Sequence, residues 1–446
     1  MCENPAKSKK LYLTGGNLKE DTLLRHGEIS VSESEKRANG SLNLREYYTV
    51  YLIETKATDP EFQNKLSKLS AVWRRYTEFE QLRDYLEHTY PFIVIPPLPE
   101  KRVLFSWQKV STDTFDPDFV DRRRAGLETF LLRIASHPVL SYDKHFIEFL
   151  QNEDGWRETF KSNGYLQIAE NKLKALSVSV RLKNTDPRFE SIKTYGNTLH
   201  TSIYNLLKAR SRVAEKQYTV YKLHANYGRV FSEWSAIEKE MGDALQKTGH
   251  YLDSLSSSID SLLEDEELLV DQFKEYLFFA SSLQNLCKHQ ELLQLKLESA
   301  EDNITLKNSE LLESAEDNIT LKNSERVKAQ QGKMGIMSRL FGTIDTDEVR
   351  ELKDGEVVVG DTKTELTDFC TKASADIDRF QSQKCIDLKE TLAAYAFLQL
   401  KTARKVNQKC IDLKETLAAY AFLQLKTARK GLQTWTQIRD CLQNIP

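Results

Sequence analysis

The 446-residue sequence lacks the features on which most enzyme, metal and membrane-spanning assignments rest. It contains no HExxH, GxGxxG, P-loop, GxSxG or HxKxxxxD motif, and its eight histidines are dispersed, so we expect no enzyme and no cofactor. The six cysteines show no CxxC pair and no metal-ligand spacing, which is typical of reduced cytosolic thiols without a metal. The first residues lack the apolar core of a secretory signal, and apolar runs are too short to span a bilayer. Any membrane contact is therefore expected to be peripheral.

The sequence also lacks a strong excess of positive or negative charge. The formal net charge is −3, which argues against a chain that binds nucleic acid over its whole surface. With 40% hydrophobic and 29% charged residues, the chain has enough apolar side chains for two or three domains with long polar faces. We expect no nucleic-acid partner.

The first half of the chain predicts a small α+β domain. Residues 1–24 are polar and aperiodic and predict a mobile tail, whereas residues 25–155 alternate between strand and helix patterns. β-Branched and aromatic residues predict three strands, and 3/4 apolar spacing predicts helices after them. The strands are expected at Ile29–Ser32, Tyr47–Ile53 and Val72–Tyr76, and the helices at Glu78–Leu86, from Asp118 onward and at Tyr142–Leu150.

The second half predicts long helices. Residues 156–188 form a basic amphipathic segment that suits either a membrane interface or packing on a neighbouring domain. Beyond it, glycines divide residues 189–446 into three expected helices, 189–248, 252–335 and 345–443, with a weaker interruption at Gly355 and Gly360. An apolar seam from Phe231 to Leu262 suits coiled-coil packing. Helices this thin bury little surface within one chain, so dimerisation is expected.

Two segments recur letter for letter. Residues 297–310 return as 312–325, a step of 15, and residues 383–405 return as 408–430, a step of 25. At about 100° per residue the longer step nearly restores helical phase and could extend a helix smoothly, whereas the shorter step turns the apolar face away. Identical single recurrences favour recent duplication or a gene-model error over a functional repeat.

A cluster of cations and aromatic rings carries the strongest functional signal. Trp73-Arg74-Arg75-Tyr76-Thr77-Glu78-Phe79 is followed by the proline-rich loop Pro96-Pro97-Leu98-Pro99-Glu100-Lys101. Arginine forks suit phosphate oxygens and an aromatic face suits a ring of C–H groups, so the cluster suits a phosphorylated, sugar-like headgroup. Solvated charges at a strand end are the plainer and commoner meaning of Arg-Arg. Strand alternation turns Arg74 away from Arg75 and predicts a structural salt bridge for Arg74.

In this order, the elements resemble the sorting nexins that join a phox-homology (PX) domain to a BAR domain. The resemblance is carried by Glu28–Arg37, the Arg-Arg-Tyr-x-x-Phe motif, Pro96–Arg102, Leu131–Pro138 and Asn226–Met241. It implies an α+β PX domain with a three-stranded sheet plus helices over 25–155, followed by an all-α BAR domain over 189–446. The BAR domain would be three long antiparallel helices in a dimeric coiled-coil bundle.

The resemblance also implies residue roles. Arg75 would contact the 3-phosphate of phosphatidylinositol 3-phosphate, Tyr76 would lie under the inositol, Lys101 would meet the 1-phosphate and Arg123 would bind the 4- and 5-hydroxyls. Val103, Leu104, Phe105 and Trp107 would dip into the bilayer, although in a soluble protein the same residues would cap the core. The acidic run Glu264–Glu267 is expected away from an anionic membrane.

The implied function is that of a peripheral, cytoplasmic membrane adaptor on early endosomes. It would act in endosomal sorting and recycling and in autophagy-related traffic, as a homodimer or as a heterodimer with another PX-BAR sorting nexin. Two other hypotheses remain: a lipid-modifying enzyme, which the missing motifs disfavour, and a coiled-coil scaffold with a degenerate PX domain, which would make Arg75, Tyr76, Lys101 and Arg123 a coincidence.

Overall fold

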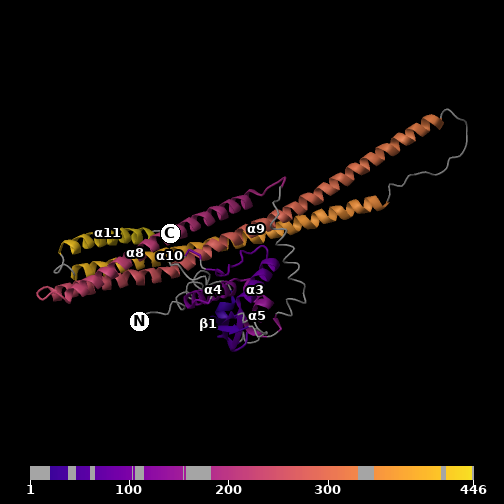
Figure 1. Ribbon diagram of the computed structural model, residues 1–446. Coiled ribbons are helices and arrows are strands. Elements are labelled where there is room, and N and C mark those ends of the chain that lie inside the picture. The colour runs from indigo at the N-terminus through magenta and orange to yellow at the C-terminus, as the bar shows by residue number, and fades with distance from the viewer. Residues whose placement is uncertain are drawn as a thin grey trace.

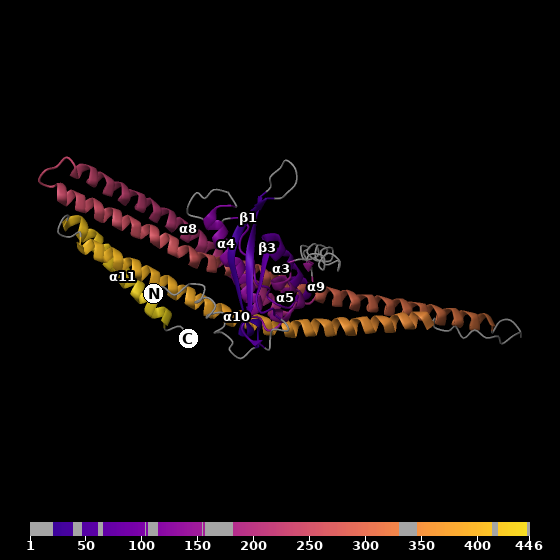
Figure 2. The ribbon, with the colours of Figure 1, turned by 90° about the horizontal axis from the view of Figure 1, so that it is seen from below.

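The protein combines a small α+β domain with a rod of long helices (Figure 1). The computed structural model describes residues 21–38, 47–60, 66–102, 104–105, 115–153, 155–156, 182–329, 346–412 and 418–443. Seen from below, the small domain lies against the middle of the rod, which extends to both sides of it (Figure 2). None of the helices in these ranges has the length and apolar character needed to cross a bilayer.

The sheet of the small domain is antiparallel, in the order β1 (Gly27–Ala38), β2 (Tyr47–Ala57) and β3 (Ser70–Arg75). Alternation sends Tyr51, Ile53 and Val72 into the core. β3 ends at Arg75 and α3 (Tyr76–Thr89) begins at the next residue. The strand expected over Val72–Tyr76 is confirmed, but it ends one residue earlier than expected, and the bend places Arg75 and Tyr76 at one corner of the domain.

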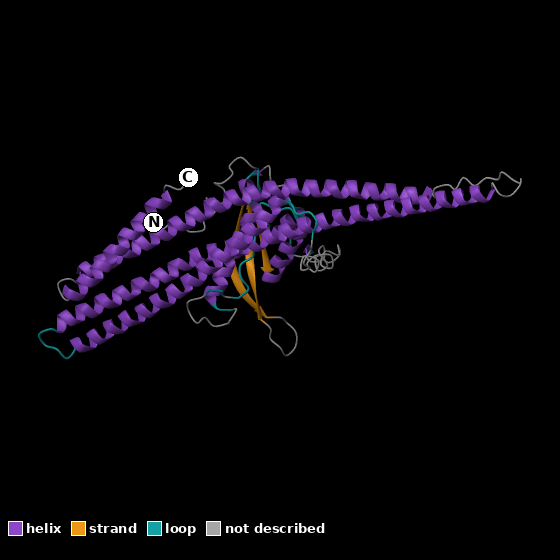
Figure 3. Cartoon of the chain, turned by 90° about the horizontal axis from the view of Figure 1, so that it is seen from above, coloured by secondary structure: helices purple, strands orange, loops and turns teal. Residues whose placement is uncertain are grey.

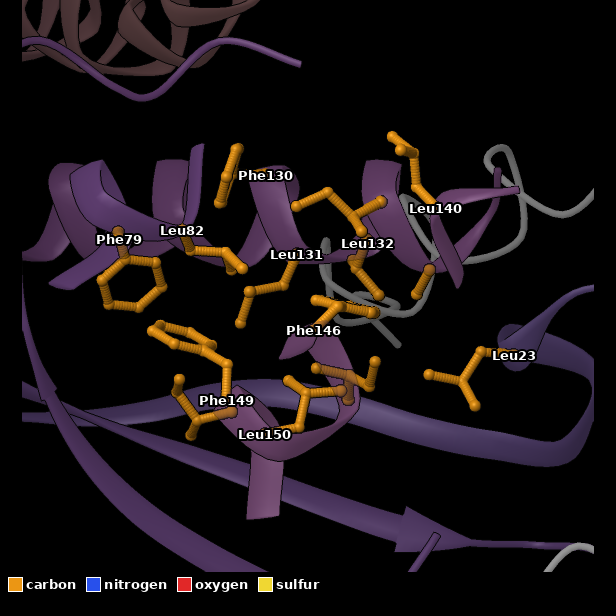
Figure 4. Packing of buried hydrophobic residues seen from close by; sticks show 14 of the residues in the cluster. Leu23, Phe79, Leu82, Phe130, Leu131, Leu132, Leu140, Phe146, Phe149 and Leu150 are labelled. Carbon is orange, nitrogen blue, oxygen red and sulfur yellow. The ribbon is translucent and has the colours of Figure 1, made fainter. Parts of the chain in front are cut away.

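Helices cover one face of this sheet. α3, α4 (Pro117–Ala135) and α5 (Lys144–Gln151) enclose a core in which Phe79 meets Phe130 and Phe149 edge to face (Figure 4). The start of α4 follows from its sequence, because Asp116 caps the backbone N–H of Phe119 and Pro117 occupies the first turn. A short helix, α2 (Leu23–His26), buries Leu23 and Leu24, so the packed region begins slightly before residue 25. A 3-10 turn, η2 (Leu140–Tyr142), precedes α5.

The rod is built from α8 (Pro187–Ser235), α9 (Gly242–Ala329), α10 (Thr346–Asp412) and α11 (Ala418–Gln443), which Figure 3 shows running along one another. The first break therefore falls at 236–241, and the expectation that α8 reaches residue 248 is wrong. Gly249 instead lets two helices touch: a Cβ there would lie 2.7 Å from the carbonyl oxygen of Gly228 in α8. Leu245, Leu252 and Leu262 are buried after the break, whereas Trp234 before it is half exposed.

Other glycine expectations have mixed outcomes. α10 runs without interruption through Gly355 and Gly360, so the weaker break expected there is wrong. The Cβ position of Gly355 lies 3.2 Å from Ile304 of α9, which again marks close helix packing. The turn expected near Gly335 and Gly342 lies outside the described residues, between α9 and α10.

The two repeats behave differently. The 15-residue repeat stays inside α9, and it loses its phase as expected: Leu297 is 7% exposed, whereas its counterpart Leu312 is 65% exposed. The 25-residue repeat does not extend α10 smoothly. α10 ends at Asp412, and α11 returns along it with Trp435 packed 5.2 Å from Tyr395, ring centre to ring centre. Since α9 begins only at Gly242, a straight α10 would soon run beyond its partner helix.

Candidate lipid-headgroup site

The two arginines of the motif leave β3 on opposite faces. Arg74 is 1% exposed and donates to the carbonyl oxygens of Phe149, Asn152 and Glu153, and it lies 3.8 Å from a carboxylate oxygen of Glu78. Its predicted structural role is confirmed. The guanidinium of Arg75 instead lies 3.5 Å from the ring centre of Tyr48 on β2, on the partly exposed face. Arg75 is thus the arginine of this pair that a ligand could reach.

Tyr76 is held by the proline-rich loop. Its hydroxyl donates to the carbonyl oxygen of Pro99 at 2.6 Å, and burial, reinforced by Glu80, raises the pKa of Tyr76 well above its usual range. The ring therefore remains neutral and fixed. Gly126 of α4 permits the loop to come this close, because a Cβ there would lie 2.6 Å from Pro99. No pattern in the sequence marked Gly126 as part of this site.

Cations lie near the Tyr76 ring from two directions. The guanidinium of Arg123 is 5.1 Å and the ammonium of Lys101 is 6.0 Å from the ring centre. Arg123 also donates to the backbone oxygen of Lys101 at 2.8 Å. Tyr76, Lys101 and Arg123, three of the four expected residues, therefore lie close together. Arg75 directly precedes Tyr76 in the chain. Lys101 Nζ contacts Glu80 at 2.6 Å, so a phosphate at Lys101 has to compete with this carboxylate.

The expected insertion loop is only partly described. Val103 and Trp107 lie outside the described residues, and Leu104 is 41% exposed. Phe105 packs on the rod: its ring centre lies 5.3 Å from that of Tyr204 in α8, at an interplanar angle of 75°. Its backbone has φ of 58°, a left-handed conformation that is uncommon for a bulky residue. In this arrangement the Phe105 side chain serves a contact within the protein.

A network of charges joins the site to the rod. Arg133 of α4 donates to both carboxylate oxygens of Glu275 and to Asp387, and Tyr276 also donates to Asp387. Glu100 pairs with Lys274 at 2.9 Å and Arg122 pairs with Glu267 at 2.7 Å. A cavity of about 500 Å³ lies among the proline loop, α4, α9 and α10.

Part of the acidic run Glu264–Glu267 joins this network. Glu266 is 3% exposed, pairs with Arg210 of α8 and accepts from Gln399 of α10, and Glu267 faces the small domain. Two of its four residues point inward because partners from three other elements converge there: Arg210 of α8, Arg122 of α4 and Gln399 of α10. Local sequence carries no signal for such partners, since they lie between 56 and 145 residues away.

Comparisons with known proteins agree with this architecture. The PX domain family matches residues 63–153, inside the α+β region. Sorting nexin-4 of Mus musculus is 43% identical over 444 residues, covering 97% of this chain and 90% of that protein. The chain belongs to the sorting nexin family. Sorting nexin-4 of Homo sapiens is 44% identical over 95% of the chain, and sorting nexin-30 of Xenopus tropicalis is 31% identical over 59%.

A solved structure supports the fold. The cryo-EM structure of the SNX-BAR Mvp1 tetramer superposes with a TM-score of 0.56 at 18% identity, covering 86% of this chain and 99% of that one. The expected PX fold followed by a helical BAR-type region is thus confirmed. Because sorting nexins with this architecture are membrane-trafficking adaptors, the chain is a peripheral, endosome-associated sorting protein and not an enzyme.

Proposed function

We propose that this sorting nexin binds phosphatidylinositol 3-phosphate and acts on early endosomes, in sorting and recycling and in autophagy-related membrane traffic. The PX domain would span residues 25–155, the amphipathic linker 156–188 and the BAR domain 189–446. The observation that carries the proposal is the convergence of Arg123 and Lys101 on the ring of Tyr76, with Arg75 at the adjoining strand end.

The chemistry of these residues supports a phosphorylated inositol. Arg75 would take the 3-phosphate with its forked donors, Lys101 the 1-phosphate and Arg123 the ring hydroxyls, while Tyr76 supports the ring from below. Hydrogen bonds to charged groups contribute about 1.5–3 kcal/mol each, so the set suffices for modest affinity. Leu104, with Val103 and Trp107, would add apolar contact with the bilayer beside the headgroup.

The test is flotation with vesicles that differ only in the lipid headgroup. We expect the full chain to bind vesicles with phosphatidylinositol 3-phosphate and to bind poorly when phosphatidylinositol replaces it. Arg75→Met and Tyr76→Ala should abolish the difference, and Lys144→Met, at a side chain that is 83% exposed on α5, should leave it unchanged. Equal binding by wild type and both site variants would exclude the headgroup assignment.

We further propose that the BAR region dimerises, either with a second copy or with another PX-BAR sorting nexin. An apolar stripe with heptad spacing runs along the outer side of α8, its members 41–55% exposed: Leu206, Val213, Val220, Tyr227 and Trp234. A groove of about 550 Å³ between α8 and α9 continues the stripe through Ile259 and Leu262. The molar mass in solution tests this: we expect a dimer that Val220→Glu reduces to a monomer, and a monomeric wild type would exclude the homodimer.

A further inference from the structure

Two cations of the candidate site each follow a residue that is tied to the rod. Glu100, directly before Lys101, pairs with Lys274 of α9, and Arg122, directly before Arg123, pairs with Glu267 of α9. Positions 267 and 274 are two helical turns apart and therefore lie on one face of α9. One helix face thus holds both segments that carry the headgroup-facing cations.

The loop has a second anchor after Lys101. Phe105 packs edge to face on Tyr204 of α8 and joins the apolar cluster of the rod. A left-handed backbone at a non-glycine residue persists only where its surroundings hold it, and the ring of Tyr204 is a described neighbour that holds the Phe105 side chain. Lys101 therefore lies between two contacts with the rod, an ion pair at Glu100 and an aromatic pair at Phe105.

The ion pair between Glu100 and Lys274 is largely buried. The side chain of Lys274 is 5% exposed and that of Glu100 is 13% exposed, so neither charge is well solvated without the other. The other described carboxylate at Lys274 is Asp271, 3.5 Å away on the same helix. Glu100 is thus the partner that links Lys274 to the loop.

We propose that the BAR helices hold the headgroup site in its binding arrangement, with Lys274 and Tyr204 as positioning residues for Lys101, whose backbone oxygen in turn accepts from Arg123. This inference rests on the proposed function and adds to it that lipid affinity depends on residues outside the PX domain. Any change that separates the PX domain from α8 and α9 would leave Lys101 held by Arg123 and Glu80 alone among these contacts, and its place beside Tyr76 would be less fixed.

The experiment uses the full chain and vesicles that contain either phosphatidylinositol 3-phosphate or phosphatidylinositol. Lys274→Met and Tyr204→Ala should each weaken the 3-phosphate-dependent part of binding by about tenfold, the equivalent of about 1.4 kcal/mol. Binding to vesicles rich in phosphatidylserine without the phosphoinositide should not change. Lys288→Met, at an exposed position of α9, and Tyr204→Phe, which keeps the ring, should behave as wild type.

A double variant separates positioning from general weakening of the fold. If the ion pair acts on the loop, Glu100→Gln with Lys274→Met should lose no more 3-phosphate-dependent affinity than either single change. Additive losses, or wild-type binding by a folded Lys274→Met protein, would overturn the inference. Should Lys274→Met not fold, the Tyr204→Ala and Tyr204→Phe pair decides the question. A wild type that ignores the 3-phosphate would remove the proposed function itself and this inference with it.

Discussion

Arg74 and Arg75 are neighbours in one strand, and their guanidinium groups lie on opposite faces of the sheet. Arg74 closes the C-terminal end of α5 by donating to main-chain oxygens, whereas Arg75 lies over the Tyr48 ring. Two identical side chains therefore have different surroundings: Arg74 holds the fold from the interior, and Arg75 lies on the partly exposed face.

The first prediction separates these purposes. Arg74→Met removes the donor to the buried carbonyl oxygen of Phe149 and the charge beside the buried Glu78, so we expect a loss of about 3 kcal/mol in the free energy of unfolding of the PX domain. Arg75→Met removes one cation–π contact and should cost about 1 kcal/mol or less. Chemical denaturation of both variants measures the difference, and equal losses would contradict the assignment of Arg74 to the interior.

The contact between α8 and α9 gives a second prediction. A methyl group at position 249 would lie 2.4 Å from Ser232 Oγ and 2.7 Å from the backbone of Gly228, so Gly249→Ala should destabilise the protein by about 1–3 kcal/mol. Gly360→Ala is the matched control in α10, because beyond the adjoining backbone of its own helix nothing lies within 4 Å of the added methyl group. It should stabilise by about 0.5–1 kcal/mol through helix propensity. Thermal unfolding midpoints that shift in the same direction would contradict this.

His26 predicts a dependence on pH. Its two ring nitrogens face Asp21 at 2.7 Å and Asp59 at 3.0 Å, and both donate only when the ring is protonated. The hydrogen bond to Asp21 raises the pKa of His26 despite partial burial. This stabilisation is fully present below pH 6.5 and is lost as pH rises through the higher, folded-state pKa. His26→Asn should thus destabilise more at pH 6 than at pH 9, and an equal loss at both pH values would contradict the two ion pairs of His26.

Cysteine reactivity provides a fourth prediction. Burial raises the pKa of Cys287 to about 12, and its thiol donates to the backbone oxygen of Phe189. Since the thiolate is the reactive form, iodoacetamide at pH 8 should label the exposed Cys441 and spare Cys287 in the native protein. Mass spectrometry of the tryptic peptides reads this out, with urea-unfolded protein as the control in which both react. Equal native labelling would contradict the buried position of Cys287.

Features governed by short-range periodicity could be predicted from the sequence. The opposite orientations of Arg74 and Arg75 follow from a period of two, and the lost phase of Leu312 follows from a step of 15 in a helix. The helix expected from Asp118 onward begins at Pro117, one residue earlier.

Features that depend on distant partners could not be predicted. Gly249 was expected to interrupt a helix. Its close contact with Gly228 forms only when α8 folds back on α9, and the local sequence does not show this contact. The ion pair of Glu100 and Lys274 joins residues 174 positions apart, and the return of α11 depends on where α9 begins. In each case the local sequence carried no information about the distant residue or helix that the segment contacts in the folded protein.

The buried contacts of Arg133 with Glu275 and Asp387 have a geometric consequence for the whole protein. Breaking such a pair leaves an uncompensated charge, so the PX domain does not swivel freely on the rod. The PX domain therefore keeps a fixed orientation relative to the rod. A headgroup bound at Tyr76 would then set the tilt of a helical rod many times longer than the site itself, and a single lipid contact would orient the entire molecule against the membrane.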